Sequence, residues 1–318
     1  MGTFAPIILF VYNRPEHTKK VVEALLRNSI ANQSDLFVFA DGPKENATIE
    51  DIDKLVSVRQ YIKTISGFKS VTIIEQTKNK GLDPSEIDGV TQVINQFNRV
   101  IVLEDDTIVL PLFLQFMNEA LEFYKFNPKV FSIGSFSPKI DYLNRIKSSV
   151  YSSYRCASFG WATWKDRWDK CIWDKEYILN SRLIKHPTIY NKLKYNRAGG
   201  DMYDNLVAYA NGNNDAWDAR WQYCLYENNG VCIRPTKSLT YNIGFDGTGE
   251  HCGDLDVEKF GLMPILDLST IYNIEFKTDT NVSISLQYYM FKFYRYDKTP
   301  LYKKVKWAIK DGLKNIVS

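Results

Sequence analysis

Three acidic residues stand directly after an apolar run, where their types and spacing favour metal chemistry. Glu104, Asp105 and Asp106, which we call the acidic triplet, follow residues 100–103, which read Val-Ile-Val-Leu. Carboxylates crowded at the tip of a buried strand repel one another, and a hard cation such as Mn²⁺ or Mg²⁺ relieves that repulsion. A structural alternative exists, because Asp106 or Thr107 could cap the following helix. The triplet therefore indicates either a divalent-metal site or a helix cap.

Polar residues also end two earlier apolar runs. Tyr12, Asn13 and Arg14 close the first run, and Asp41 follows the second. Because the carboxyl ends of parallel strands meet at one edge of a sheet, these residues are expected to converge with the acidic triplet at a ligand site. The loops GxGxxG and GxxxxGK[ST] are missing, which excludes a Rossmann dehydrogenase and a P-loop enzyme. A bound nucleotide would then need its diphosphate neutralised by a metal.

Alternating strands and helices must position these residues. The continuous apolar runs predict strands at 6–12, 36–40, 71–76 and 99–105, and apolar residues at helical spacing predict helices at 17–28, 48–65, 88–97 and 110–124. Strands that are apolar on both sides belong to a parallel sheet covered by helices on both faces. The expected fold class is therefore α/β.

The composition is that of an ordinary globular protein. Its 318 residues suit roughly two domains or one large α/β unit. A formal net charge of +3 is too balanced for a domain that wraps nucleic-acid phosphates, so no nucleic-acid partner is expected. Five scattered cysteines favour a reduced, cytoplasmic location over a disulfide framework. The apolar run at 6–12 is too short to span a bilayer and lacks the flanks of a signal peptide.

Several segments, in collinear order over about residues 5–255, resemble GT-A-type glycosyltransferases related to N-acetylglucosaminyltransferase I. These segments are PIILFVYNRPEHTKKVVEALL, FVFADGPK, NKGL, VIVLEDDTIVLPLFLQFMNEALEFY, FGWATW and WDARWQYCLYENNGVCIRPTKSLTYNIGFDGTGEHCG. The family's variant of the Asp-x-Asp metal motif is Glu-Asp-Asp, as in the acidic triplet. The resemblance implies a GT-A-type fold, with a mostly parallel sheet flanked by helices and, in this chain, a C-terminal helical tail.

The resemblance also implies a donor site for a nucleotide sugar, expected to be a UDP-sugar. Asp106 would be the ligand of Mn²⁺ or Mg²⁺, and the metal would bridge the donor diphosphate. Asp41 would lie near the uracil or ribose, and Arg14 near the base or phosphate; the alternative for both is an ordinary cap or salt bridge. The residues expected to bind the nucleotide sugar are Tyr12, Arg14, Asp41, Gly81, Glu104 and Asp105.

An inverting transfer also needs a carboxylate that takes the proton of the acceptor hydroxyl. The family keeps this Asp shortly after a Trp, which matches Asp218 after Trp217. The family then reads Asp-Trp, whereas this chain is one residue longer at that point. Asp215 is therefore the alternative base, and it could instead cap the helix predicted at 215–228.

Two further features belong to the acceptor side. Trp161, Trp164, Trp168 and Trp173 fall within thirteen residues, and the first three are predicted to share one helical face. They either pack in the core or stack on an acceptor sugar, with Trp161 as the expected acceptor residue. Residues 242–253 contain four glycines and His251, so they could close over the donor, with His251 on the metal or diphosphate or simply at the surface.

The last part of the chain is basic. Residues 287–318 carry eight Lys or Arg against two Asp, and apolar residues recur at helical spacing from residue 301. A basic amphipathic helix of this kind predicts peripheral contact with a membrane surface, or docking on the protein itself or a partner. The expected domains are a catalytic domain at 1–255, with a nucleotide-sugar half at 1–108 and an acceptor half at 109–255, and an extension at 256–318.

The resemblance, taken with these patterns, implies a metal-dependent, inverting hexosyl- or N-acetylhexosaminyltransferase. It would move a sugar from a UDP-sugar to a glycan or lipid-linked saccharide in surface polysaccharide synthesis, at the inner face of the cell membrane. A sugar nucleotidyltransferase is one alternative, although it would need a Gly-rich turn where this chain has YNRP. A non-catalytic carbohydrate-binding protein is another, although it would not need the acidic triplet. No oligomeric state is predicted.

Overall fold

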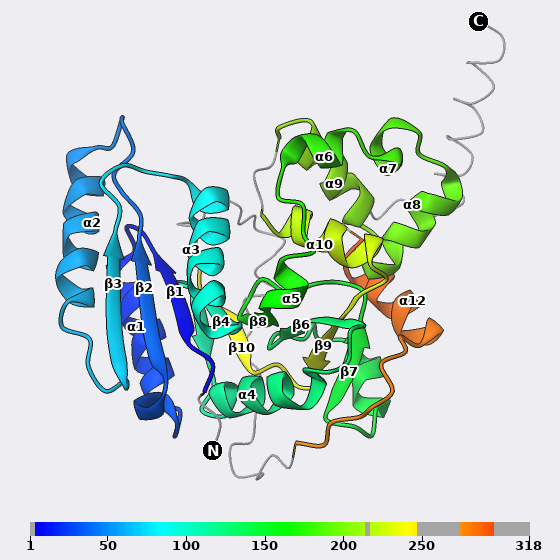
Figure 1. Ribbon diagram of the computed structural model, residues 1–318, viewed down its shortest axis with the longest axis horizontal. Coiled ribbons are helices and arrows are strands. Elements are labelled where there is room, and N and C mark those ends of the chain that lie inside the picture. Colours follow the sequence, from blue (N-terminus) through cyan, green and yellow to red (C-terminus); the bar gives the residue numbers. More distant parts are fainter. Residues whose placement is uncertain (1–3, 214–216, 247–273, 296–318) are drawn as a thin grey trace, which may run out of the picture.

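The centre of the protein is one eight-stranded sheet with helices on both faces (Figure 1). The computed structural model describes residues 4–213, 217–246 and 274–295. In spatial order the strands are β3 (Ser70–Glu75), β2 (Asp35–Ala40), β1 (Ile7–Val11), β4 (Arg99–Glu104), β8 (Trp161–Trp164), β6 (Val130–Gly134), β9 (Val231–Pro235) and β7 (Val150–Ser153). Six strands run in one direction, and only β8 and β7 oppose them. The prediction of an α/β fold with a mostly parallel sheet is confirmed.

The two faces of the sheet carry separate apolar cores. The helices on one face are α1 (Pro15–Leu26), α2 (Ile49–Ile62) and α4 (Phe113–Tyr124), and those on the other are α3 (Leu82–Phe97), α5 (Lys165–Trp168) and α10 (Asp218–Glu227). Strand residues alternate between the cores, so that Ile7 and Leu9 face the first group of helices and Ile8 and Phe10 face the second. Burial on both faces explains why these strands read as continuous apolar runs.

A third cluster lies beside α10. The short helices that build it are α6 (Lys175–Leu179), α7 (Arg182–Lys185), α8 (Ile189–Tyr195) and α9 (Met202–Ala210). Figure 1 shows them grouped on the side of the sheet that lies away from α1 and α2. Their buried residues, such as Leu183 and Leu206, pack with Tyr223 of α10. These helices therefore form a separate layer over α10.

The helix cap considered for the acidic triplet does not form. Thr107 begins strand β5 (Thr107–Val109), which pairs antiparallel with β10 (Thr240–Asn242). The following helix, α4, starts three residues after Leu110 and has Leu112 at its N-cap, without a capping side chain. The pairing of β5 with β10 takes the backbone after the triplet into a second, two-stranded sheet, so the cap interpretation was wrong.

The tryptophan cluster also differs from its prediction. Trp161 and Trp164 lie on strand β8 rather than on a helix, and they face opposite cores. The Trp161 ring stacks on Trp217, with 4.9 Å between centroids, and on Trp168, at 5.9 Å. Trp221, which has no exposed surface, lies 5.4 Å from the Trp168 ring. The cluster therefore forms through long-range packing and not through a shared helical face.

Part of the C-terminal segment is helical and docks on the sheet. Helix α12 (Ile284–Phe293) begins at Ser283, whose side chain accepts a hydrogen bond from the Leu286 amide. Leu286 and Met290 are buried against Leu143 and Tyr151. The amphipathic helix predicted from residue 301 lies outside the described residues. No helix in the described ranges is long and apolar enough to cross a membrane.

Replacing Trp221 tests this packing. Trp221→Ala deletes a fully buried ring and is expected to lower the free energy of unfolding by about 3–5 kcal/mol, measured by urea denaturation. Phe126→Ala is the control, because the Phe126 side chain is 85% exposed and its loss should cost less than about 0.5 kcal/mol. Equal losses in the two variants would contradict the described cluster.

Candidate active site

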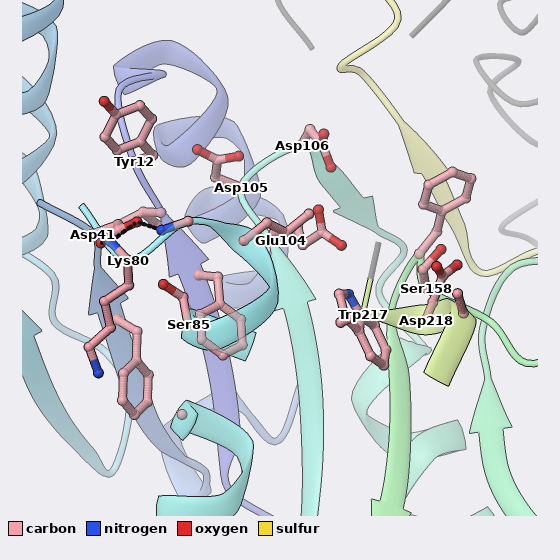
Figure 2. Close-up of a pocket in the computed structure, with 18 of the residues that line it drawn as sticks. Tyr12, Asp41, Lys80, Ser85, Glu104, Asp105, Asp106, Ser158, Trp217 and Asp218 are labelled. Carbon is pink, nitrogen blue, oxygen red and sulfur yellow. Dashed lines mark hydrogen bonds between the residues drawn. The ribbon is translucent and has the colours of Figure 1, made fainter. Parts of the chain in front are cut away.

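A cavity of about 970 Å³ opens where the parallel strands end. Its lining includes the residues that follow β1, β2 and β4, namely Tyr12, Arg14, Asp41 and the acidic triplet. It continues to Trp217 and Asp218 at the start of α10. Figure 2 shows the triplet between the Tyr12–Asp41 side and the Trp217–Asp218 side. The structure thus brings the predicted residues of the donor site and one predicted base into a single cavity.

Arg14 forms ion pairs with two of the three carboxylates of the acidic triplet. Parallel pairing places Phe10 of β1 opposite Glu104 of β4, so the residues that follow the two strands emerge side by side. The Arg14 guanidinium forms a hydrogen-bonded ion pair with Asp105, and its Nη1 lies 3.1 Å from Asp106 Oδ2. An Arg next to the triplet was predicted from the sheet edge, but this pairing was not.

A second contact to Asp106 comes from the opposite end of the chain. Asn242, the last residue of β10, donates a hydrogen bond from Nδ2 to Asp106 Oδ1 at 2.9 Å. The backbone of Gly244 approaches so closely that a Cβ there would lie 2.5 Å from Asp106 Oδ2. A side chain at position 244 would displace the carboxylate. Asn242 and Gly244 therefore fix the position of Asp106.

Burial raises the pKa of two carboxyl groups of the triplet, those of Glu104 and Asp105. Asp105 and Asp106 are only 3% and 7% exposed. Burial raises the pKa of Glu104 well above its ordinary value, and the negative charge of Asp106 adds to the effect. Burial also raises the pKa of Asp105, while the positive charge of Arg14 opposes the rise. One oxygen of Asp105, Oδ2, has no hydrogen-bond partner within the described part of the chain.

These residues fit a cation that is shared with a phosphorylated ligand. Within the described ranges no three His, Cys, Asp or Glu side chains are grouped to hold a metal. The buried, unpartnered Oδ2 of Asp105 and the adjacent carboxylate of Asp106 are nevertheless hard oxygen donors that face the cavity. Mg²⁺ is commonly held by one or two carboxylates together with substrate phosphates. The donor set therefore suits a divalent cation completed by a diphosphate.

Asp41 organises the loop before α3. Its carboxylate accepts hydrogen bonds from the Lys80 amide at 2.9 Å, the Gly81 amide at 3.1 Å and the Asn79 side chain at 3.0 Å. Gly81 has φ +80°, a conformation that favours glycine, and it is the N-cap of α3. Helix α3 therefore starts at Leu82, six residues before its predicted start. Asp41 positions this loop at the cavity, and its contact with a nucleoside stays a prediction.

The opposite side of the cavity starts α10. Asp218 is the first residue of that helix and is half-buried. Its negative charge is one of the effects that raise the Glu104 pKa, after burial and the charge of Asp106, so the two carboxylates influence each other across the cavity. The alternative base Asp215 and the predicted metal residue His251 lie outside the described residues.

Trp161 does not line the cavity. It is 1% exposed and lies behind Trp217, the ring of the cluster that does line it. Gly160, the residue before Trp161, lets the chain entering β8 pass close to Ser135, whose Oγ would lie 2.6 Å from a Cβ at position 160. The structure therefore places Trp161 as support for Trp217.

Arg220, two residues after the predicted base Asp218, has a structural role that sequence reasoning missed. Arg220 Nη2 lies 2.5 Å from Asp83 in the first turn of α3, and the same guanidinium donates to the Tyr209 hydroxyl and the Trp173 carbonyl. This arginine links α10 to α3 beside the cavity, which neither Arg220 nor Asp83 lines. Local sequence patterns do not predict this ion pair, because 137 residues separate Arg220 from Asp83.

The chain was compared with known proteins. No family model matches it, and no curated protein matches it. Among solved structures it is similar to the mannosyltransferase PcManGT from Pyrobaculum calidifontis, whose structure contains GDP-Man and Mn²⁺. The identity is 13% and the TM-score 0.37, over 52% of this chain and 46% of that one. The similarity thus spans less than half the length of that protein.

Removing Arg14 tests the electrostatics of the triplet. Arg14→Met leaves the buried carboxylates of Asp105 and Asp106 without their cation, so the free energy of unfolding should fall by about 3 kcal/mol. Added Mn²⁺ should then raise the melting temperature of the variant more than that of the wild type. Arg27→Met, at an exposed position, is the control. Identical responses of all three proteins to Mn²⁺ would refute the cation site.

Proposed function

We propose that this protein is a metal-dependent glycosyltransferase that moves a sugar from a nucleotide sugar to a saccharide acceptor. The observation that carries the proposal is one cavity with the acidic triplet on one wall and Asp218 on the other. Its volume of about 970 Å³ suits a nucleotide sugar together with part of an acceptor. The collinear family resemblance supports a UDP-sugar as donor.

The residues around the acidic triplet and the loop held by Asp41 would bind the donor. Asp105 and Asp106 would hold Mn²⁺ or Mg²⁺, which when bound supplies charge stabilisation for the departing nucleoside diphosphate. Arg14, already beside both carboxylates, would orient the diphosphate with its guanidinium. The loop held by Asp41 would shape the nucleoside end of the cavity, with Tyr12 beside it.

Asp218 is the proposed base. Its carboxylate would accept the proton of the acceptor hydroxyl as that oxygen attacks the sugar from the side opposite the diphosphate, which inverts the anomeric centre. Asp218 is the first residue of α10 and lines the cavity opposite the acidic triplet. Asp215, three residues earlier, stays the alternative base. Trp217 would offer its ring to an acceptor sugar.

The wider assignments follow from the same proposal. We infer a nucleotide-sugar half at 1–108 and an acceptor half at 109–255, because the lining residues divide between them. A hexosyl or N-acetylhexosaminyl donor, a glycan or lipid-linked acceptor, surface polysaccharide synthesis and a cytoplasmic site of action at the membrane are proposed from the resemblance and the basic tail at 287–318.

Calorimetry tests the donor site. The wild type is expected to bind UDP in the presence of Mn²⁺ and to bind it more weakly with the metal removed by EDTA. Asp106→Asn should lower the affinity for UDP with Mn²⁺ on the order of a hundredfold, because a carboxylate ligand is lost. Asp53→Asn, on the exposed face of α2, is the matched control and should behave as the wild type. Failure of the wild type to bind any nucleoside diphosphate with Mn²⁺ would overturn the proposal.

Turnover tests the base. With a panel of nucleotide sugars and Mn²⁺, the wild type should slowly hydrolyse its donor, which identifies the sugar, and transfer it once an acceptor is found. Asp218→Asn should lower transfer by about 10²–10⁴-fold while UDP binding is unchanged. Asp204→Asn, exposed on α9, should retain transfer. Near-normal transfer by Asp218→Asn would remove Asp218 as the base and leave Asp215 to be tested in the same way.

A further inference from the structure

The side of the cavity away from the acidic triplet carries two arginines, Arg155 and Arg234, as well as the carboxylate of Asp218. Arg155 follows β7, and Arg234 lies on β9, and both line the cavity. Between β4, which carries the triplet, and β9 lie β8 and β6. Three strand-to-strand steps correspond to about 14 Å. Charges on β9 therefore act on a different part of a bound ligand from those that hold the donor diphosphate.

Arg155 is fully compensated. Its guanidinium binds both oxygens of Asp201, at 2.7 and 3.0 Å, and lies over the Tyr294 ring, 3.7 Å from the centroid. Asp201 is 5% exposed and also accepts a hydrogen bond from Asn205. The Asp201 carboxylate is thus already engaged by Arg155.

Arg234 has no such partner. Its side chain is 1% exposed, and Nη2 donates to the main-chain carbonyls of Arg155 and Cys156. Its Nε and Nη1 have no hydrogen-bond partner among residues 4–213, 217–246 and 274–295. The side chains next to Arg234 include Tyr294 and Tyr151, which are phenols and not carboxylates. Burial raises the pKa of Tyr151 to about 12, so that phenol does not supply a negative charge. Arg234 is therefore a buried cation whose charge is not balanced by a described carboxylate.

A buried guanidinium without a counter-charge is costly. Removing a cation from water costs several kcal/mol unless an anion or a full set of hydrogen bonds offsets it. The two carbonyls satisfy only one of the three nitrogens of Arg234. A second donor on the same side, the Tyr195 hydroxyl, is also buried and without a partner in the described structure, and Tyr195 lines the same cavity. Both groups suit a ligand that brings negatively charged oxygens.

We propose that Arg234 binds an anionic group, a carboxylate or a phosphate, on the acceptor saccharide. The inference rests on the proposed function, because it takes the cavity to hold donor and acceptor together, and it narrows the acceptor to an acidic or phosphorylated sugar. Charge-assisted hydrogen bonds from Nε and Nη1 would meet the anion, with the Tyr195 hydroxyl as a further donor. Arg155, neutralised by Asp201, would hold the loop whose carbonyls orient Arg234.

Binding of three simple probes to the wild type tests the proposal. Methyl β-glucuronide carries a carboxylate, glucose 6-phosphate carries a phosphate, and methyl β-glucoside carries neither. At fixed ionic strength, with UDP and Mn²⁺ and again without them, at least one charged probe should bind about tenfold or more tightly than the glucoside. Which charged probe binds better distinguishes a carboxylate from a phosphate. Charged probes that bind no better than the glucoside, undetectable binding included, would overturn the proposal.

Variants locate the effect. Arg234→Gln should abolish the preference for charged probes while UDP binding with Mn²⁺ is unchanged. Arg167→Gln is the matched control, because Arg167 is another buried arginine that donates to main-chain carbonyls but does not line the cavity. An undiminished preference in a folded Arg234→Gln protein would exclude Arg234 as the binding residue.

Asp201→Asn keeps the test decisive if Arg234→Gln does not fold. Without the Asp201 charge, both arginines lack compensation, so charged probes should bind several-fold more tightly and the glucoside unchanged. A gain of binding cannot arise from misfolding, and unchanged or weaker binding of the charged probes would count against the proposal. Loss of UDP binding in the wild type would instead contradict the proposed function, so the two failures are distinguishable.

Discussion

The pairing of Arg14 with Asp105 and Asp106 is the interaction on which the candidate site depends. Two buried carboxylates and a third beside them cannot lie together at one strand end unless a cation balances them. Arg14 reaches them because β1 and β4 are adjacent and parallel, with Phe10 opposite Glu104. The same contact leaves the triplet facing the cavity, with one oxygen of Asp105 unpartnered among the described residues. Fold and site chemistry are therefore linked through one ion-pair network.

Two other features are arranged around this network. The pairing of β5 with β10 brings Asn242 and Gly244 against Asp106, and the Asp41 carboxylate holds the loop that starts α3. Arg220 ties α3 to α10, the helix that begins with the proposed base. Each contact satisfies a buried charge and also positions a wall of the cavity. Loss of any one of these contacts is therefore expected to cost stability and to shift a wall of the cavity.

Much of the fold could be predicted because local signals were strong. The first four parallel strands and the helices between them follow from apolar runs and helical spacing, and the acidic triplet is visible at the end of its strand. The prediction of secondary structure failed where a local pattern fitted two conformations. Trp161 and Trp164 have helical spacing but lie on β8, because burial between two layers decided the conformation. Asp106 and Thr107 suited a cap but continue into β5.

The sequence by itself determined the α/β architecture and the location of the acidic triplet, since the apolar runs and helical spacing that predict both are patterns of residues near in the chain. Only the tertiary structure decided which side chains form hydrogen bonds and ion pairs with the acidic triplet. Arg14 meets Asp105 across 91 residues and Asn242 meets Asp106 across 136. Arg234 lies in an apolar strand, and its lack of a counter-charge appears only once β6, β7 and the cavity surround it. Whether a buried charge has a counter-charge depends on which residues the fold brings together, and the distance between residues along the chain does not show this.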